Sequence, residues 1–143
     1  MGRVIRAQVV IPGQARGRLL VSREPLSFWG GYDYRTGTII DQRHPLAGQV
    51  AAGRILALPH TRGSSTTTAV LLEAVAAGTA PAAILTTGVD SFFALAAIVA
   101  DELYQTAFPL LSLTSEDFAL LITDDPARIE GDLIMLSSGE ADV

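Results

Sequence analysis

The chain has 143 residues, of which 15 are Asp or Glu and 10 are Arg, with no Lys and no Cys, so its formal net charge is −5. This length predicts a single domain over residues 1–143, and the negative charge argues against a nucleic-acid partner. The absence of Cys excludes disulfides, thiol catalysis and cysteine ligation of zinc or of an iron–sulfur cluster by this chain.

The first half of the chain predicts strands joined by loops. Val- and Ile-rich residues 3–11 predict a strand, residues 13–17 a turn, residues 18–22 a return strand and residues 37–41 a further short strand. Between them lies the loop 24–36, in which two adjacent glycines accompany four aromatic residues: Phe28, Trp29, Tyr32 and Tyr34. Functional residues concentrate on loops, so this segment is a candidate binding loop. The alternative is a packed surface loop.

The second half alternates strands and helices. Strands are predicted at residues 53–58, 81–85, 108–113 and 127–136. Helices are predicted at 66–77, stopped by Gly78, at 91–103, capped by Asp90, and in a short turn opened by Thr114–Asp117 in the manner of a capping box. This order predicts an α/β fold, with a parallel sheet built from right-handed βαβ units. We expect the N-terminal strands to form a second β layer.

No segment of the sequence indicates a membrane protein or an exported one. The longest apolar run, residues 92–100, falls short of the roughly 20 residues that a spanning helix needs. No secretory signal is visible at the N-terminus. We therefore expect a cytoplasmic protein with no membrane partner. Charged residues make up only 17% of the chain, against a usual value of about 25%, which favours a surface partly buried in another protein.

The charges are distributed unevenly along the chain. Residues 1–72 carry nine Arg against three acidic residues, whereas residues 73–143 carry one Arg against twelve. Arg binds carboxylates and phosphates through two parallel hydrogen bonds, so the Arg-rich half is expected to line a site for an anionic small molecule. The alternative is that the acidic half forms solvated helices.

The turn between the strand at 53–58 and the helix at 66–77 carries the candidate chemistry. Ligands of open α/β sheets bind at the carboxyl ends of strands, and a helix N-terminus offers free N–H groups to an anion. Arg62 adds a full charge, and Gly63 allows close approach of the backbone. Ser64 and Ser65 are either helix caps or functional hydroxyls. The turn is neither a Walker loop nor a nucleophile elbow, because GK[ST] and G-x-S-x-G are absent.

Several stretches spread over residues 1–135 resemble the small subunit of the aconitase X group. They include Ser22–Asp33 (SREPLSFWGGYD), His44–Gly48 (HPLAG), Arg62–Ser65 (RGSS) and Gly78–Ile84 (GTAPAAI). The resemblance implies a swivelling β/β/α domain like the mobile domain of aconitase. It also implies docking on a large subunit that holds an iron–sulfur cluster, with no cofactor bound by this chain.

By this resemblance the two subunits together dehydrate a small hydroxy acid, and the family's catalytic serine falls on Ser64. We expect Arg62, Gly63, Ser65, Phe28, Gly30 and Gly31 to bind substrate. The family's usual Gly-Gly and Gly-Ser pairs are replaced here by His60-Thr61 and Thr67-Thr68. The resemblance implies cis-3-hydroxy-L-proline or mevalonate 5-phosphate as substrate. We expect cis-3-hydroxy-L-proline, because an all-Arg composition is commoner in GC-rich bacterial genomes than in the archaea in which the phosphomevalonate enzyme occurs. Mevalonate 5-phosphate is the alternative.

These roles agree with the chemistry of dehydration next to a carboxylate. The reaction needs a base at one carbon and a Lewis acid for the leaving hydroxyl, and this chain has no metal-ligand set to provide the latter. A serine base must be an alkoxide, and a helix N-terminus stabilises an anion by at most about 2 kcal/mol. Arg62, the exclusion of water on docking and a substrate-bound metal must supply the rest. We therefore expect the isolated chain to be inactive.

Two other classes of function remain open from the sequence. One is the mobile phosphohistidine domain of phosphotransfer enzymes, which shares the swivelling architecture and would use His60. In those domains, however, the histidine follows the Gly–Ser/Thr stretch, whereas His60 precedes it. The other is a non-catalytic binding module. His60 and His44 are otherwise expected to be hydrogen-bonded turn residues.

Overall fold

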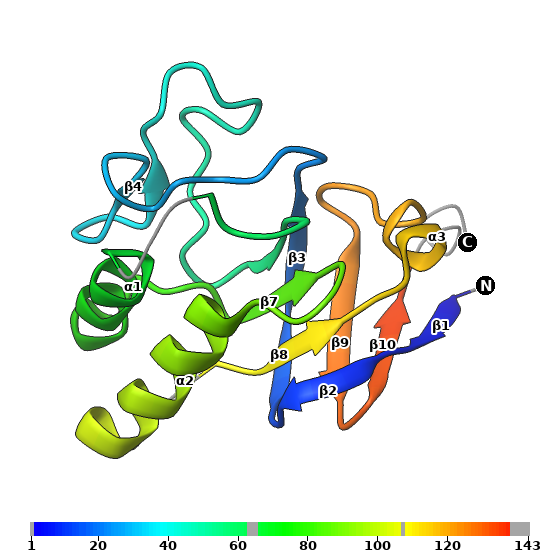
Figure 1. The fold of residues 1–143 in the computed structure, drawn as a ribbon. Coiled ribbons are helices and arrows are strands. Elements are labelled where there is room, and N and C mark those ends of the chain that lie inside the picture. Colours follow the sequence, from blue (N-terminus) through cyan, green and yellow to red (C-terminus); the bar gives the residue numbers. More distant parts are fainter. Residues whose placement is uncertain (1, 63–65, 107, 138–143) are drawn as a thin grey trace.

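The computed structural model describes residues 2–62, 66–106 and 108–137. Eight strands form one continuous sheet, and two long helices, α1 (Thr66–Ala77) and α2 (Ser91–Tyr104), pack side by side on one part of it (Figure 1). In these ranges no helix has the length and apolar character needed to cross a membrane.

The sheet has an antiparallel half and a mostly parallel half. Its strand order is β1-β10-β9-β3-β6-β7-β8-β2. The bounds are β1 Arg3–Arg6, β2 Gln8–Ile11, β3 Gln14–Val21, β6 Ile55–Ala57, β7 Ala83–Thr86, β8 Leu110–Ser112, β9 Pro126–Glu130 and β10 Leu133–Leu136. Strands β3, β6, β7 and β8 run parallel, with β2 antiparallel at the end, whereas β1, β10, β9 and β3 are antiparallel neighbours.

Strand β3 joins the two halves. Residues Gln14–Arg18 pair with β9, and residues Leu19–Val21 pair with β6. The turn predicted at residues 13–17 is therefore wrong, because Gly17 lies inside this strand. A Cβ on Gly17 would lie 2.9 Å from the carbonyl oxygen of Gly53, so glycine is required here for close packing and not for a turn.

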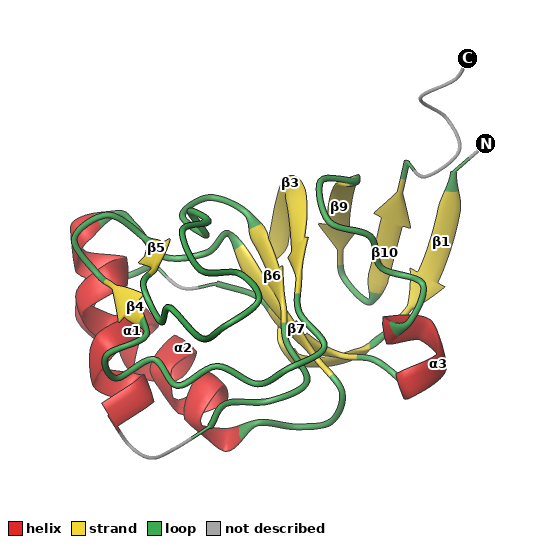
Figure 2. Cartoon of the chain, turned by 90° about the horizontal axis from the view of Figure 1, so that it is seen from above, coloured by secondary structure: helices red, strands yellow, loops and turns green. Residues whose placement is uncertain are grey.

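Two cores on opposite faces of the parallel half give a layered β/β/α fold. Leu56 points to one face and packs with the buried residues of α1 and α2, whereas its neighbours Ile55 and Ala57 point to the other face. That second face packs against inward residues of β9 and β10, such as Ile129 and Ile134. Because successive side chains of a strand point to opposite faces of the sheet, each central strand is buried on both faces. The layers are visible in Figure 2, where helices α1 and α2 lie on one side of β6 and β7, and strands β9, β10 and β1 lie on the other. The predicted fold class is confirmed.

Two predicted strands are each two strands in the structure. Residues 3–11 form β1 and β2, separated by Ala7, whose N–H donates to the carbonyl of Asp132. Residues 127–136 lie in the hairpin β9–β10, which turns at Gly131 with a φ of 61°. The second β layer therefore contains C-terminal as well as N-terminal strands.

The helix predictions are confirmed closely. Helix α1 ends before Gly78, which has a φ of 77°, as a left-handed stop requires. Asp90 is the N-cap of α2. The short helix α3 (Ser115–Phe118) is capped by Thr114, whose hydroxyl accepts from the N–H of Asp117. The loop 24–36 and its continuation hold two small paired strands, β4 (Tyr32–Asp33) and β5 (Thr38–Ile39).

Candidate functional site

Three loops meet at the carboxyl ends of the parallel strands. The loop after β3 runs beside the loop after β6, with a parallel bridge between Leu26 and Thr61 and a 3.0 Å hydrogen bond from the N–H of Arg62 to the carbonyl of Leu26. The loop after β7 joins them through the N–H of Thr87, which donates to the carbonyl of Pro59 at 3.1 Å. The structure therefore brings together two predicted segments. We call residues 24–36 the aromatic loop, and the segment between β6 and α1 that contains Thr61 and Arg62 the anion turn.

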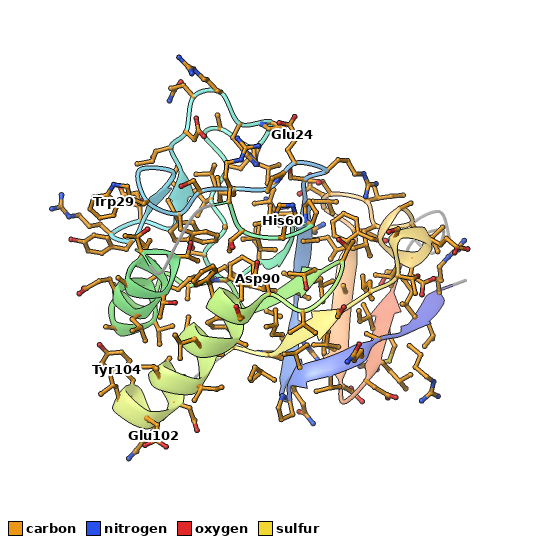
Figure 3. The ribbon with its side chains drawn as sticks, in the orientation of Figure 1. Glu24, Trp29, His60, Asp90, Glu102 and Tyr104 are labelled. Atoms are coloured by element: carbon orange, nitrogen blue, oxygen red, sulfur yellow. The ribbon has the colours of Figure 1, made fainter. Side chains whose placement is uncertain are left out.

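Asp90 anchors the anion turn to helix α2 (Figure 3). One carboxylate oxygen accepts from the N–H groups of Phe92 and Phe93 at 3.0 and 3.2 Å. The other accepts from the N–H of Thr61 at 2.7 Å and from its hydroxyl at 2.9 Å. The Asp90 side chain is buried and has a donor on each oxygen, so it fixes the backbone of Thr61 directly before Arg62. The sequence indicated the cap but not this second attachment.

We expect Asp90→Asn to release the anion turn while leaving the cap of α2 in place. One oxygen remains for the helix N–H groups, but an amide NH₂ now faces the N–H of Thr61. A buried donor left without an acceptor costs about 1–3 kcal/mol. Urea unfolding should show this loss, and hydrogen exchange should become faster at the Thr61 amide but not at Phe92. Thr114→Ala is the matched control, because it removes a cap far from this turn and costs about 1 kcal/mol. A Thr61 amide as protected as in the wild type would contradict the anchoring role.

Arg62 is exposed beside this anchor, and in the described part of the chain no residue hydrogen-bonds or ion-pairs with its guanidinium. Its backbone is held by the bond to Leu26, so the side chain starts from a fixed point and is available to an anion. The predicted site residues Gly63, Ser64 and Ser65 lie outside the described residues, and their roles stay predictions. Helix α1 follows from Thr66.

The Thr67-Thr68 pair belongs to the packing between helices. Both side chains are buried, and the hydroxyl of Thr68 donates to the carbonyl of Phe92 at 3.3 Å. The contact joins the first turn of α1 to the first turn of α2. Thr67 and Thr68, which replace the family's usual Gly-Ser pair, therefore help to pack α1 against α2 next to the anion turn.

Phe28, predicted to bind substrate, is a core residue in the structure. Its side chain has no exposed area, stacks on Tyr32 with ring centroids 5.1 Å apart, and meets Phe93 of α2 edge-on at 5.5 Å. The neighbouring Trp29 is 70% exposed and points away from the core at the outer edge of the loop (Figure 3). Both residues are aromatic, so the sequence has no signal that separates the buried side chain from the exposed one.

The two glycines of this loop have structural reasons of their own. Gly30 has a φ of 76°, in the left-handed region that favours glycine. A Cβ on Gly31 would collide with the carbonyl oxygen of Ser27. Both glycines shape the turn that buries Phe28 and exposes Trp29. Their predicted contacts with substrate stay predictions.

Burial also fixes the protonation of Tyr32. Desolvation raises the pKa of its phenol above the ordinary value. The protonated hydroxyl donates to the carbonyl of Thr79 at 2.7 Å. Tyr32 thereby attaches the aromatic loop to the end of helix α1, and it acts as a structural donor.

The two histidines are hydrogen-bonded turn residues, as expected. His44 is buried; its Nδ1 accepts from the N–H of Leu46, and its Nε2 lies 3.4 Å from the carbonyl of Glu24. His60 is exposed and its Nδ1 donates to the carbonyl of Thr61 at 2.7 Å. His60 lies in the loop after β6, six residues before helix α1, and not at the helix start that a phosphohistidine domain uses.

The residues of this chain do not fit an iron–sulfur cluster. The sequence has no Cys. In residues 2–62, 66–106 and 108–137, no three His, Asp or Glu side chains gather closely enough to hold a metal ion. The chemistry that the described residues of this site offer is anion binding by Arg62 on an anchored loop.

Comparison with known proteins gives three concordant findings. A family profile described as the aconitase X swivel domain matches residues 4–137. The cis-3-hydroxy-L-proline dehydratase of Pseudomonas aeruginosa is 46% identical over 110 residues, which cover 77% of this chain and 19% of that protein. The phosphomevalonate dehydratase small subunit of Methanothermobacter thermautotrophicus is 38% identical over 120 residues, or 84% of this chain and 87% of that one.

The fold comparison agrees with these sequence matches. The crystal structure of Thermococcus kodakaraensis aconitase X in its holo-form superimposes with a TM-score of 0.83 and 29% identity, covering 94% of this chain and 98% of that one. The chain spans about a fifth of the length of the two hydroxyproline dehydratases that it matches, from Pseudomonas aeruginosa and Hypocrea jecorina.

Proposed function

Because the chain belongs to the aconitase X swivel-domain family, we propose that it is a single swivelling domain that acts as the small subunit of a dehydratase. The observation that carries the proposal is the anion turn. Arg62 stands exposed at the carboxyl end of β6, on a backbone held by Leu26 and, through Thr61, by Asp90. A rigid loop of this kind positions a charged group on a substrate with little loss of entropy on binding.

The residues of this chain have two tasks in the proposed reaction. Arg62 binds the substrate carboxylate through two parallel hydrogen bonds. Ser64 removes the proton from the carbon next to that carboxylate, assisted by Arg62 and by exclusion of water when the subunits dock. We place the iron–sulfur cluster in the proposed large subunit, as the family resemblance implies, and this chain has no Cys that could ligate one.

The proposed substrate is cis-3-hydroxy-L-proline. The 46% identity to the Pseudomonas aeruginosa dehydratase supports it, and so does the all-Arg composition. Mevalonate 5-phosphate is the second candidate, and the length of this chain favours it. This chain covers 87% of the archaeal phosphomevalonate dehydratase small subunit, so the two chains are similar in length. Both substrates carry a carboxylate for Arg62, and only the second carries a phosphate.

The proposal is tested by reconstitution with the aconitase X-type large subunit of the same genome. We expect no turnover by the 143-residue chain alone, and dehydration of cis-3-hydroxy-L-proline by the pair. Mass spectrometry would detect a product lighter by one water. Mevalonate 5-phosphate, assayed in parallel, decides between the two candidates. Turnover by the chain alone, or an assembled pair that dehydrates neither compound, would contradict the proposed function. A phosphorylated His60 would favour the phosphotransfer class instead.

A further inference from the structure

A second basic surface lies on the outer side of the antiparallel half-sheet, apart from the anion turn. Strands β1, β3, β9 and β10 surround a hollow of about 760 Å³ there. We call it the arginine face, and its defining residues are Arg16, Arg18 and Arg128, with Val4 and Met135 beside them. No acidic side chain is among the described residues that line it.

The strand register concentrates positive charge on this face. Arg16 of β3 lies directly opposite Arg128 of β9, which in turn lies opposite Met135, and Met135 opposite Val4. Arg18 is two residues after Arg16, so it projects from the same face of β3. Like charges placed directly opposite each other in a sheet destabilise it. The pairing of Arg16 with Arg128 thus disfavours folding unless an anion offsets it.

The groups around the arginines offset this charge only in part. The Nε of Arg128 pairs with Glu130 at 2.9 Å, with both side chains half exposed. Arg18 donates to the backbone carbonyl of Asp124, which is neutral. Arg16 and Arg3 make no hydrogen bond or ion pair with any residue that the structure describes. Among the residues that the structure describes, the guanidinium groups of Arg16 and Arg18 on this face therefore have no carboxylate partner.

The position of the hollow indicates what covers it. Gly2 and Ser137, the first and last described residues, both line it. In the longer relatives, of which this domain is about a fifth, the polypeptide that joins the domain to the rest of the protein starts from one of these ends. In those longer relatives the rest of the polypeptide is therefore joined to the domain near the arginine face. Val4, 61% exposed, adds an apolar contact in the same row.

We infer that the arginine face docks an acidic, extended segment of the large dehydratase polypeptide. The inference rests on the proposed function for the existence of that partner. Asp and Glu side chains of such a segment would take bidentate bonds from Arg16, Arg18 and Arg128, and its apolar residues would cover Val4 and Met135. This surface is separate from Arg62, so it contributes to assembly and not to chemistry.

The test compares the double variant Arg16→Gln, Arg18→Gln with wild type in binding to the large subunit, by calorimetry at low and high salt. We expect at least a tenfold weaker complex at low salt and a smaller salt dependence, with kcat retained at saturating large subunit. The thermal midpoint of the free variant should not fall, because the repulsion between Arg16 and Arg128 is relieved. Arg35→Gln is the matched control, since Arg35 is exposed and, among the described residues, its guanidinium interacts only with the ring of Tyr34, whose centroid is 5.8 Å away.

Unchanged affinity of the double variant, or an equal loss with Arg35→Gln, would overturn the docking inference. Duplex DNA is the alternative anionic occupant of the arginine face. If the double variant lost binding to DNA but kept its affinity for the large subunit, the docking inference would also be overturned. A wild-type pair that assembles through this face but dehydrates neither hydroxy acid would overturn the proposed function alone. A wild-type pair that does not assemble would overturn both.

Discussion

Replacing Ser64 with Ala is expected to slow dehydration by the reconstituted enzyme about 100-fold to 10,000-fold, which is the usual contribution of a general base. We expect the variant to keep the fold, because the change removes one hydroxyl from the segment of the sequence between β6 and α1. The measurement is kcat of the complex with the thermal midpoint recorded beside it. In the sequence Ser64 directly follows Gly63, a residue type that allows the close approach of backbone to substrate that the proposal requires.

Ser65→Ala is the matched control for this prediction. If Ser65 caps helix α1, its loss costs about 1 kcal/mol of stability and leaves the chemistry nearly intact. The two variants are therefore expected to differ in which property changes, the rate for Ser64→Ala and the stability for Ser65→Ala, as well as in the size of the effect. A Ser64→Ala enzyme that has a lowered midpoint but turns over within a few-fold of wild type would make the hydroxyl a structural cap, and the proposed mechanism would be wrong.

Phe28→Ala is expected to destabilise the isolated chain by about 3–5 kcal/mol, the usual cost of truncating a fully buried Phe. The ring packs between Tyr32 and Phe93, so its removal opens a cavity between the aromatic loop and helix α2. Urea unfolding measures the loss. Trp29→Ala, one residue away but 70% exposed, should change stability by less than about 0.5 kcal/mol.

The same pair of variants separates a packing role from a binding role for Phe28. A Phe28→Ala chain that keeps wild-type stability while the reconstituted enzyme shows a raised KM would restore the predicted contact with substrate. A large loss of stability, with the KM of the surviving folded enzyme unchanged, would leave Phe28 in the core.

Local signals were sufficient to predict the helices and the parallel strands. Asp90, Thr114 and Gly78 act within a few residues of the helix ends that they define, and the buried strands β6 and β7 are short apolar runs. The βαβ order then constrains the topology, because crossovers are right-handed. The predicted fold class depended on these elements, and it is correct.

The errors concern features that depend on distant parts of the chain. Residues 3–11 have one continuous apolar pattern, yet β1 pairs with β10 and β2 with β8, and no periodicity shows that change of partner. Gly17 suggested a turn, but it is required by the backbone of residue 53. In the site, Arg62 and Asp90 were visible in the sequence. The bond from Asp90 to Thr61 was not, because it joins residues 29 positions apart.

The split between β1 and β2 has a consequence for how the protein avoids self-association. These two strands are the outer strands of the eight-stranded sheet, yet only Ala7 separates them in the chain. Each is four residues long, and β1 carries Arg at both ends. Short, charged edges are poor templates for pairing with another molecule. A chain that is 49% hydrophobic thus exposes little backbone on which aggregates can grow, and loss of its first six residues would uncover the apolar strand β10.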